Sequence, residues 1–309
     1  MAESNVVRVG TRGSTLALRQ TEEVLEQLRP LHPELDFQIV VVRTQGDANA
    51  AAPLAGMGLG VFVKEIEQQL LAGRLDLAVH SLKDLPTKLP QGLNIGAVLQ
   101  RQDPRDVLVN KWGCLVSELP EGARIGTSSP RRVAQLKNCC PKVNVLSIRG
   151  NVETRLRKAQ GDEYDGAVLA AAGIIRLGLT GEITEYLSPQ QFVPPPGQGA
   201  LAIEVRADDT RMTELLQPAE HAPTSAAITA ERSFLEALGG GCQVPVGAYA
   251  HCDGDTLLIT VFLGSTDGSQ VFRANLQSSI HQPQQLAREA YQALVKQGAG
   301  RLLAAAKAG

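Results

Sequence analysis

Apolar runs with few charges alternate with amphipathic stretches along the first two thirds of the chain. Residues 6–11 form such a run, and residues 37–42 are a dense β-branched run typical of a buried parallel strand. Between them, Ser14 can cap a helix that reaches Arg29, with Pro30 closing it. A strand, a helix and a second strand in this order predict a βαβ unit at the start of the fold.

The same alternation continues before the pattern changes in the last third. Further strands are predicted over residues 75–80, 93–98, 143–148, 166–169 and 201–205, and helices over residues 62–72 and 209–217. The last part combines a helix ending at Leu238, three strands over residues 246–250, 256–263 and 270–276, and a helix over residues 283–297. Asp253-Gly254 is a good hairpin turn between the first two of these strands. We therefore expect a small α+β domain at the end of the chain.

Two stretches break the alternation and indicate crossings between domains. Residues 101–106 combine charge with proline, and residues 192–197 contain three consecutive prolines. A chain that leaves one α/β domain, builds a second and returns forms a cleft that can close about a hinge. The expected fold class is α/β, with two doubly wound domains flanking a cleft and a small α+β C-terminal domain. The expected boundaries are residues 1–99 with 200–217 for the first domain, 100–199 for the second, and 218–309 for the third.

The composition argues against several classes of protein. Hydrophobic residues make up 43% of the 309 residues, and the net charge of -2 provides no global field for nucleic acid or an acidic membrane. The sequence has no run of about 20 apolar residues and no apolar secretory segment at its start, so we expect a cytoplasmic protein that binds no membrane. The five cysteines include no C-x-x-C pair, and neither disulfides nor a metal site is expected.

Polar residues that could carry chemistry follow the strand predicted over residues 75–80. Ser81, Lys83 and Asp84 stand at its C-terminal end, the edge where open α/β sheets place their ligands. An aspartate shortly before a proline is also common as a plain turn residue. Position alone makes Asp84 a candidate functional carboxylate, and both interpretations stay open at this point.

Two predicted helix starts carry clustered arginines. Thr127-Ser128-Ser129-Pro130 is typical of a helix N-terminus and is followed at once by Arg131 and Arg132. Arg149-Gly150 precedes Asn151, which can cap a helix that bears Arg155. The alternative is a basic, solvated first turn, but the helix dipole disfavours cations at an N-terminus. The pattern therefore favours two anion sites made from local parts.

A cysteine follows three glycines at residues 239–241. One glycine would be enough to end the preceding helix, whereas three allow bulky groups to approach the sulfur of Cys242, and Pro245 stiffens the exit. The pattern favours a loop that presents this thiol. It does not show what the sulfur holds.

Together these segments resemble the porphobilinogen deaminase family, whose members are also called hydroxymethylbilane synthases. The matching motifs occur in family order and begin at Arg8 (RVGTRGS), His80 (HSLKDLP), Gly126 (GTSSPRR), Arg149 (RGNV), Gly197 (GQGA) and Gly240 (GGCQVP). The resemblance implies a transferase of tetrapyrrole and haem biosynthesis that joins four porphobilinogen molecules, with loss of ammonia, on an enzyme-held dipyrromethane. It also implies two domains similar to periplasmic binding proteins and a third that carries the cysteine.

The resemblance further implies roles for individual residues. Asp84 would be the catalytic carboxylate, and Cys242 would hold the dipyrromethane cofactor through a thioether. Cofactor contacts are also implied for Ser81, Lys83, Asp84, Thr127, Ser129, Arg131, Arg132, Arg149, Gly150 and Arg155. Substrate contacts are implied for Arg12, Ser14, Gln20, Phe62, Asn151, Arg176 and Gln198. The expected partner is porphobilinogen, on a monomeric enzyme that binds no nucleic acid.

The sequence departs from the family in the segment that corresponds to its lid. No Lys or Arg occurs between Thr44 and Val63, where the lid of the family usually carries lysines, so we expect a mostly steric lid.

Two other functions were weighed against this one. A protein that only binds an organic anion would account for the arginines but has no use for a Gly-Gly-Gly-Cys loop. An acyl transferase with a cysteine nucleophile would need a histidine base, and none of the five histidines is a convincing partner by sequence.

Overall fold

The computed structural model describes residues 5–44, 63–239 and 244–308. The chain divides into two compact units. One consists of Met1–Gln102 with Ala200–Ser225, and the other of Asp103–Gly199 with Ala226–Gly309. Each unit is built around its own sheets.

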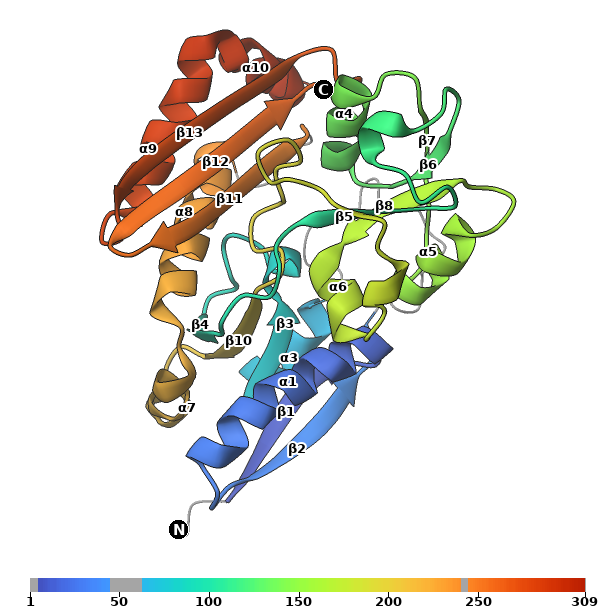
Figure 1. Cartoon of the computed structure of the whole chain (residues 1–309). Coiled ribbons are helices and arrows are strands. Elements are labelled where there is room, and N and C mark those ends of the chain that lie inside the picture. The colour runs from blue at the N-terminus through green and yellow to red at the C-terminus, as the bar shows by residue number, and fades with distance from the viewer. Residues whose placement is uncertain (1–4, 45–62, 240–243, 309) are drawn as a thin grey trace. The chain divides into compact units, whose positions relative to one another are not determined.

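The first unit contains a five-stranded sheet in the order β2-β1-β3-β10-β4 (Figure 1). Its strands are β1 (Val6–Arg12), β2 (Asp36–Val42), β3 (Leu77–Ser81), β4 (Leu93–Val98) and β10 (Leu201–Arg206). β1 runs parallel to β2 and β3, whereas β10 is antiparallel to β3 and β4. β10, which comes late in the sequence, therefore lies inside the sheet, between two strands from the beginning of the chain.

Amphipathic helices cover this sheet, namely α1 (Thr15–Leu31), α3 (Lys64–Leu71) and α7 (Thr210–Leu216). α1 buries Val24, Leu25 and Leu28 completely in the core cluster, and each such side chain contributes about 1.5–3 kcal/mol. The expected end of α1 before Pro30 was wrong, because Pro30 lies inside the helix, which ends at Leu31. A proline in the last turn removes only one hydrogen bond, at an end that frays in any case.

Residues 37–42 form the predicted parallel strand, but the expectation that this strand is buried was wrong. β2 is an edge strand that pairs only with β1 in the described sheet, so one of its edges has no neighbouring strand to cover it. Phe37 and Val42 are buried, but Ile39 and Val41 are 38% and 51% exposed. The β-branched residues at these positions serve strand conformation rather than core packing.

The second unit contains a five-stranded sheet in the order β7-β6-β8-β5-β9. The strands are β5 (Asp106–Asn110), β6 (Arg124–Gly126), β7 (Asn144–Leu146), β8 (Gly166–Ala170) and β9 (Glu185–Tyr186). Its helices are α4 (Pro130–Cys139), α5 (Val152–Ala159) and α6 (Ala171–Arg176). β6 is parallel to β7 and β8, and β5 is antiparallel to β8 and β9, so both large sheets of the protein are mixed.

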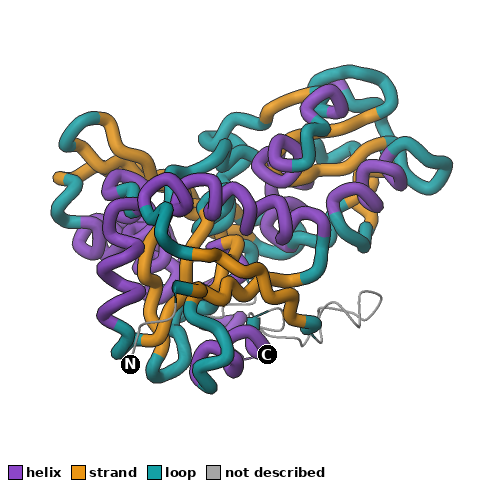
Figure 2. The backbone as a smooth tube through the Cα atoms, turned by 90° about the horizontal axis from the view of Figure 1, so that it is seen from below, coloured by secondary structure: helices purple, strands orange, loops and turns teal. Residues whose placement is uncertain are grey.

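The same unit contains the three-stranded antiparallel sheet β11-β12-β13, and Figure 2 shows the helices and strands of the described chain from below. Its elements are α8 (Ala222–Ala237), β11 (Val246–Asp253), β12 (Thr256–Gly264), β13 (Val271–Ser279), α9 (Pro283–Leu294) and α10 (Gly300–Ala308). Gly254 forms the predicted hairpin turn with φ +56°, a conformation that favours glycine. The fold is thus α/β, with a small α+β part near the C-terminus.

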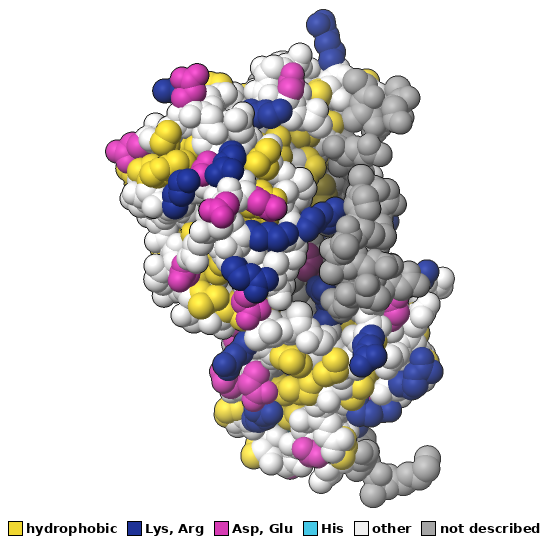
Figure 3. Space-filling model, turned by 90° about the vertical axis from the view of Figure 1, so that its right-hand side faces the viewer, with side chains coloured by type: hydrophobic (Ala, Val, Ile, Leu, Met, Phe, Trp, Pro, Cys, Tyr) yellow, Lys and Arg dark blue, Asp and Glu magenta, His cyan; other side chains and the backbone are white. Residues whose placement is uncertain are grey.

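The surface of the described chain mixes charges of both signs. On the face in Figure 3, basic side chains lie among acidic ones, as expected for a net charge of -2. None of the helices in the described part of the chain is long and apolar enough to cross a membrane.

Candidate active site

A pocket in the first unit lies at the C-terminal ends of β1 and β3. Arg12 ends β1 and Ser81 ends β3, which continues into a 3-10 turn over Leu82–Asp84. Within the described residues, the pocket is lined by Arg12, Ser14, Leu16, Ala17, Gln20, Val63, Val79, His80, Ser81, Lys83 and Asp84. Asp84 is the one acidic side chain among these described residues. The pocket thus gathers every site residue predicted in this unit whose structure is described.

Helix α1 positions two of the polar groups of the pocket. Ser14 Oγ accepts a hydrogen bond from Ala17 N at 3.3 Å and caps the helix, as predicted. Gln20 is 7% exposed and donates from Nε2 to Ser81 Oγ at 2.8 Å. This bond joins α1 to the end of β3 and orients the Ser81 hydroxyl.

A buried acidic cluster beside the pocket was not predicted. His80 Nε2 lies 3.1 Å from Oε2 of Glu204 on β10, and both side chains are buried. Burial and the charge of Glu204 raise the pKa of Glu67 on α3 to about 7, against the opposing effect of His80. Oε1 of Glu67 and Oε1 of Glu204 have no hydrogen-bond partner within the described residues. The signal in the sequence is a glutamate between Ile66 and Leu70, on the apolar face of a helix.

The start of α4 in the second unit holds two buried arginines. Arg131 and Arg132 follow Pro130 and are 4% and 7% exposed. Asp106, at the start of β5, is completely buried, and its Oδ2 and Oδ1 accept from Arg131 Nη1 and Arg132 Nη2, both at 2.7 Å. Burial raises the pKa of Asp106, but the two guanidinium charges outweigh it and hold the pKa well below its usual range. Asp106 was missed because the sequence placed it in a linker.

The second predicted helix start adds further cations. Asn151 Oδ1 accepts at 2.8 Å from a backbone N–H of the first turn and caps α5, as predicted. Arg155 donates from Nε to Gly150 O at 2.8 Å. The pKa of Arg155 is lowered to about 10 by burial and then by the charges of Arg132 and Arg149. Arg155 is therefore near enough to Arg132 and to Arg149 to be repelled by both.

The other predicted residues of this unit have varied surroundings. Thr127 is buried, and its Oγ1 accepts from Ser129 N at 3.3 Å. Ser129 is the N-cap residue of α4, and its hydroxyl makes no capping hydrogen bond. Pro130 suits the first helical position because it has no N–H and a fixed φ. Arg176 ends α6 and donates from Nη2 to Gly199 O at 3.1 Å.

Gln198, predicted to contact substrate, lies deep in the second unit. It is 1% exposed, and its Nε2 donates to Asp106 Oδ1 and to Pro104 O, each at 2.8 Å. The amide of Gln198 therefore supports Asp106.

Three predicted features lie outside the described residues. They are Phe62, the cofactor cysteine Cys242, and the lid over residues 47–60. What is expected of them rests on the sequence alone.

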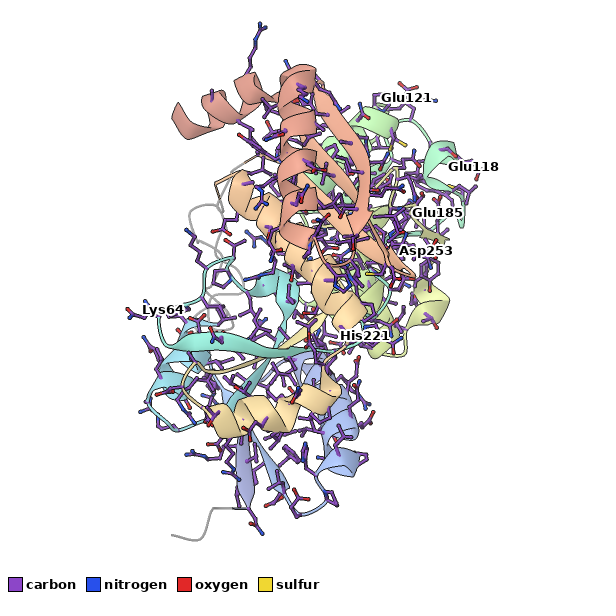
Figure 4. The ribbon with its side chains drawn as sticks, turned by 90° about the vertical axis from the view of Figure 1, so that its left-hand side faces the viewer. Lys64, Glu118, Glu121, Glu185, His221 and Asp253 are labelled. Atoms are coloured by element: carbon purple, nitrogen blue, oxygen red, sulfur yellow. The ribbon has the colours of Figure 1, made fainter. Side chains whose placement is uncertain are left out.

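Acidic side chains also occur at the edge of the second unit. Glu118 and Glu121 are exposed there and Glu185 is half-buried (Figure 4), and Glu185 Oε2 accepts from Val116 N at 2.6 Å. Asp106, the carboxylate on which Arg131 and Arg132 converge, is in contrast completely buried.

The fold and the site define an α/β protein that binds organic anions with several charges. One pocket combines a carboxylate with cations and hydroxyls, and a separate group of arginines surrounds a buried aspartate. The family model described as "Porphobilinogen deaminase, dipyromethane cofactor binding domain" matches residues 7–214, and "Porphobilinogen deaminase, C-terminal domain" matches residues 225–296. The chain therefore belongs to the porphobilinogen deaminase family.

Similar proteins agree with this assignment. A porphobilinogen deaminase of Syntrophobacter fumaroxidans is 47% identical over 299 residues, which cover 96% of this chain and 97% of that protein. The porphobilinogen deaminase of Thermus thermophilus is 46% identical over 300 residues, covering 97% and 98%. Among solved structures, the probable amino-acid ABC transporter extracellular-binding protein ytmK from Bacillus subtilis is 9% identical, with a TM-score of 0.41 over 70% of this chain and 90% of that chain. A TM-score this low defines no residue correspondence.

The arginines at the start of α4 fit the cofactor that the family model names. Nε of Arg131 and Nε of Arg132 are buried and have no hydrogen-bond partner within the described residues. A buried N–H without an acceptor costs about 1–3 kcal/mol. Carboxylate groups of a bound dipyrromethane are suitable acceptors, because guanidinium groups bind carboxylates through paired N–H groups.

Proposed function

We propose that this enzyme joins four porphobilinogen molecules head to tail on a covalently held dipyrromethane and then releases the linear tetrapyrrole hydroxymethylbilane by hydrolysis. The observation that carries the proposal is the pocket of the first unit, whose described lining combines one carboxylate, Asp84, with Arg12 and Lys83. This combination suits a substrate that carries carboxylates and reacts through a cation. Porphobilinogen, a pyrrole with acetate, propionate and aminomethyl groups, has both properties.

Asp84 is the residue to which we assign the chemistry. The C–N bond of the protonated aminomethyl group breaks, its electron pair leaves with ammonia, and the positive charge that remains is shared with the pyrrole nitrogen. A carboxylate that accepts from pyrrole N–H groups stabilises this cation as it forms. When the new C–C bond has formed, a ring carbon loses a proton, and Asp84 can accept it.

The remaining polar residues of the pocket bind and orient substrate. Arg12 can pair with a carboxylate arm, and guanidinium keeps its charge at any physiological pH. Ser14 and the Gln20–Ser81 pair add neutral hydrogen bonds from α1 and β3. We assign Arg176 a similar contact from the second unit, and the sequence resemblance adds Phe62, Asn151 and Gln198.

Cofactor binding is assigned to the arginine group of the second unit. Dipyrromethane, when bound, supplies the primer to which the first substrate ring is joined. Arg131, Arg132, Arg149 and Arg155 would pair with its carboxylates, and we place its thioether on Cys242 because the three glycines that precede it in the sequence favour a loop that presents the thiol. The sequence resemblance adds Ser81, Lys83, Thr127, Ser129 and Gly150 to this set. We further propose a cytoplasmic monomer, and size-exclusion chromatography tests the oligomeric state.

The experiment is to incubate the purified protein with porphobilinogen and to quantify both ammonia and the tetrapyrrole. The proposal predicts four ammonia molecules for each tetrapyrrole released. A protein that only binds organic anions would release no ammonia, and that result would contradict the proposal.

A further inference from the structure

Asp106 uses its whole carboxylate to hold other side chains. Oδ2 accepts from Arg131 Nη1, while Oδ1 accepts from Arg132 Nη2 at 2.7 Å and from Gln198 Nε2 at 2.8 Å. Asp106 is completely buried at the start of β5. A buried charge is stable only when it is paired and hydrogen-bonded, and here both oxygens are satisfied.

The two arginines are held by the Nη ends of their guanidinium groups. Arg131 Nη1 also donates to Val193 O at 2.7 Å, and Arg132 Nη1 donates to Val168 O at 3.0 Å. The Nε atoms are buried without a partner among the described residues. These contacts fix both guanidinium planes while their Nε–H groups stay available to an acceptor that the described protein residues do not provide.

The charges near Asp106 do not cancel. Its one negative charge faces Arg131 and Arg132, and Arg155 feels the charges of Arg132 and Arg149 in addition. Two adjacent buried guanidinium groups would repel each other without the carboxylate between them. With it, they stay together, and the group keeps an excess of positive charge for an anion.

We propose that Asp106 is a positioning residue for cofactor loading, which holds Arg131 and Arg132 with their Nε–H groups directed at the carboxylates of dipyrromethane. The inference rests on the proposed role of these arginines in cofactor binding. Asp106 itself does not touch the cofactor, because its oxygens are used by protein donors. Its negative charge and its side-chain length should therefore both affect cofactor loading.

The test compares Asp106→Asn and Asp106→Glu with the control Asp165→Asn in the full chain. Asp165 also pairs with two cations, Arg124 and Lys111, in the same unit, but neither is assigned to the cofactor. Intact mass spectrometry gives the fraction of protein that carries dipyrromethane after incubation with porphobilinogen, and thermal unfolding shows whether each variant is folded. We expect the loaded fraction of folded Asp106→Asn to fall at least about 10-fold, since a buried charge pair has lost one partner. Asp165→Asn should load as the wild type does, even if its melting temperature falls.

Asp106→Glu decides the outcome if the Asn variant does not fold. It keeps the charge but moves it by the length of one methylene. The variant should therefore fold, and its loaded fraction should be several-fold lower than that of the wild type. Full loading of folded Asp106→Asn, or wild-type loading of Asp106→Glu, would overturn the inference. Failure of both variants to fold would also overturn it, because Asp106 would then serve folding alone. A wild type without cofactor would instead contradict the proposed function.

Discussion

Arg155 donates from Nε to the carbonyl oxygen of Gly150 across 2.8 Å, so a cation assigned to the cofactor is held by the backbone just before its own helix. Gly150 has φ +118°, a conformation that other residues rarely adopt, and an added Cβ would lie 2.6 Å from Thr154 Cγ2. The position of Arg155 therefore depends on a glycine.

Gly150→Ala should lower the free energy of unfolding by roughly 1–3 kcal/mol, the scale of a strained backbone conformation, and should reduce cofactor loading. Denaturant unfolding and intact mass spectrometry measure the two effects. The control is Gly161→Ala, just beyond the end of α5, where an added Cβ would lie 3.4 Å from Lys158 O and φ is not left-handed. Equal stability of the two variants would show that the backbone at residue 150 is not a constraint.

Asp84→Asn should lower kcat by at least about 10²-fold, because it keeps the shape of the side chain but removes the charge that stabilises the substrate cation. Cofactor loading and unfolding temperature should change little. Steady-state kinetics with porphobilinogen provides the measurement, with Asp209→Asn as the control. Asp209 caps α7 in the same unit and lies outside the pocket lining, so its loss should affect stability and spare turnover. Near-normal turnover of Asp84→Asn would reduce Asp84 to a turn residue.

The arginines should divide by role. Alanine variants of Arg131, Arg132 and Arg155 should give folded protein without cofactor. Arg131 and Arg132 pair with Asp106, and Arg155 lies near Arg132, so each variant removes one cation from this group. Alanine variants of Arg12 and Arg176 should carry the cofactor and show a raised KM for porphobilinogen. Intact mass and kinetics of the five variants test the division. An Arg176→Ala protein that lacks the cofactor would contradict it.

Glu67 predicts a pH dependence of stability. Its pKa is raised from 4.5 to about 7 in the folded protein by burial and by Glu204, so the folded state holds a proton that the unfolded state has released. The contribution of Glu67 to the free energy of unfolding should therefore fall as pH rises from 4.5 to about 7 and stay constant beyond that window. Glu67→Gln should remove this component.

Urea unfolding at several pH values, for the wild type and Glu67→Gln, measures the difference. The stability of the variant relative to the wild type should rise through the window. Parallel curves would mean that Glu67 is ionised in the folded state throughout.

Strands and helices could be predicted from the local pattern of apolar and polar residues where that pattern matches the burial of the side chains in the fold. Residues 93–98 were predicted as a strand and form β4 over Leu93–Val98. The pattern failed at residues 37–42, because apolar composition does not reveal that a strand has a neighbour on one side only. Strand position within a sheet depends on the whole topology, which local composition does not contain.

Buried polar partners were the part of the site that the sequence could not provide. Nothing in the sequence pairs His80 with Glu204, which is 124 residues away. Asp106 meets Arg131 after 25 residues and Gln198 after 92. A polar side chain within an apolar run shows only that some partner exists, and the partner becomes known when the fold brings distant residues together.

The proposed reaction requires a dipyrromethane held covalently by this chain, and one intact mass spectrum of the purified protein tests this most directly. The predicted mass exceeds the sequence mass by two pyrrole units, and the Cys242→Ser variant should lack this addition. A wild-type protein that converts porphobilinogen at full rate and has the unmodified sequence mass would contradict the account.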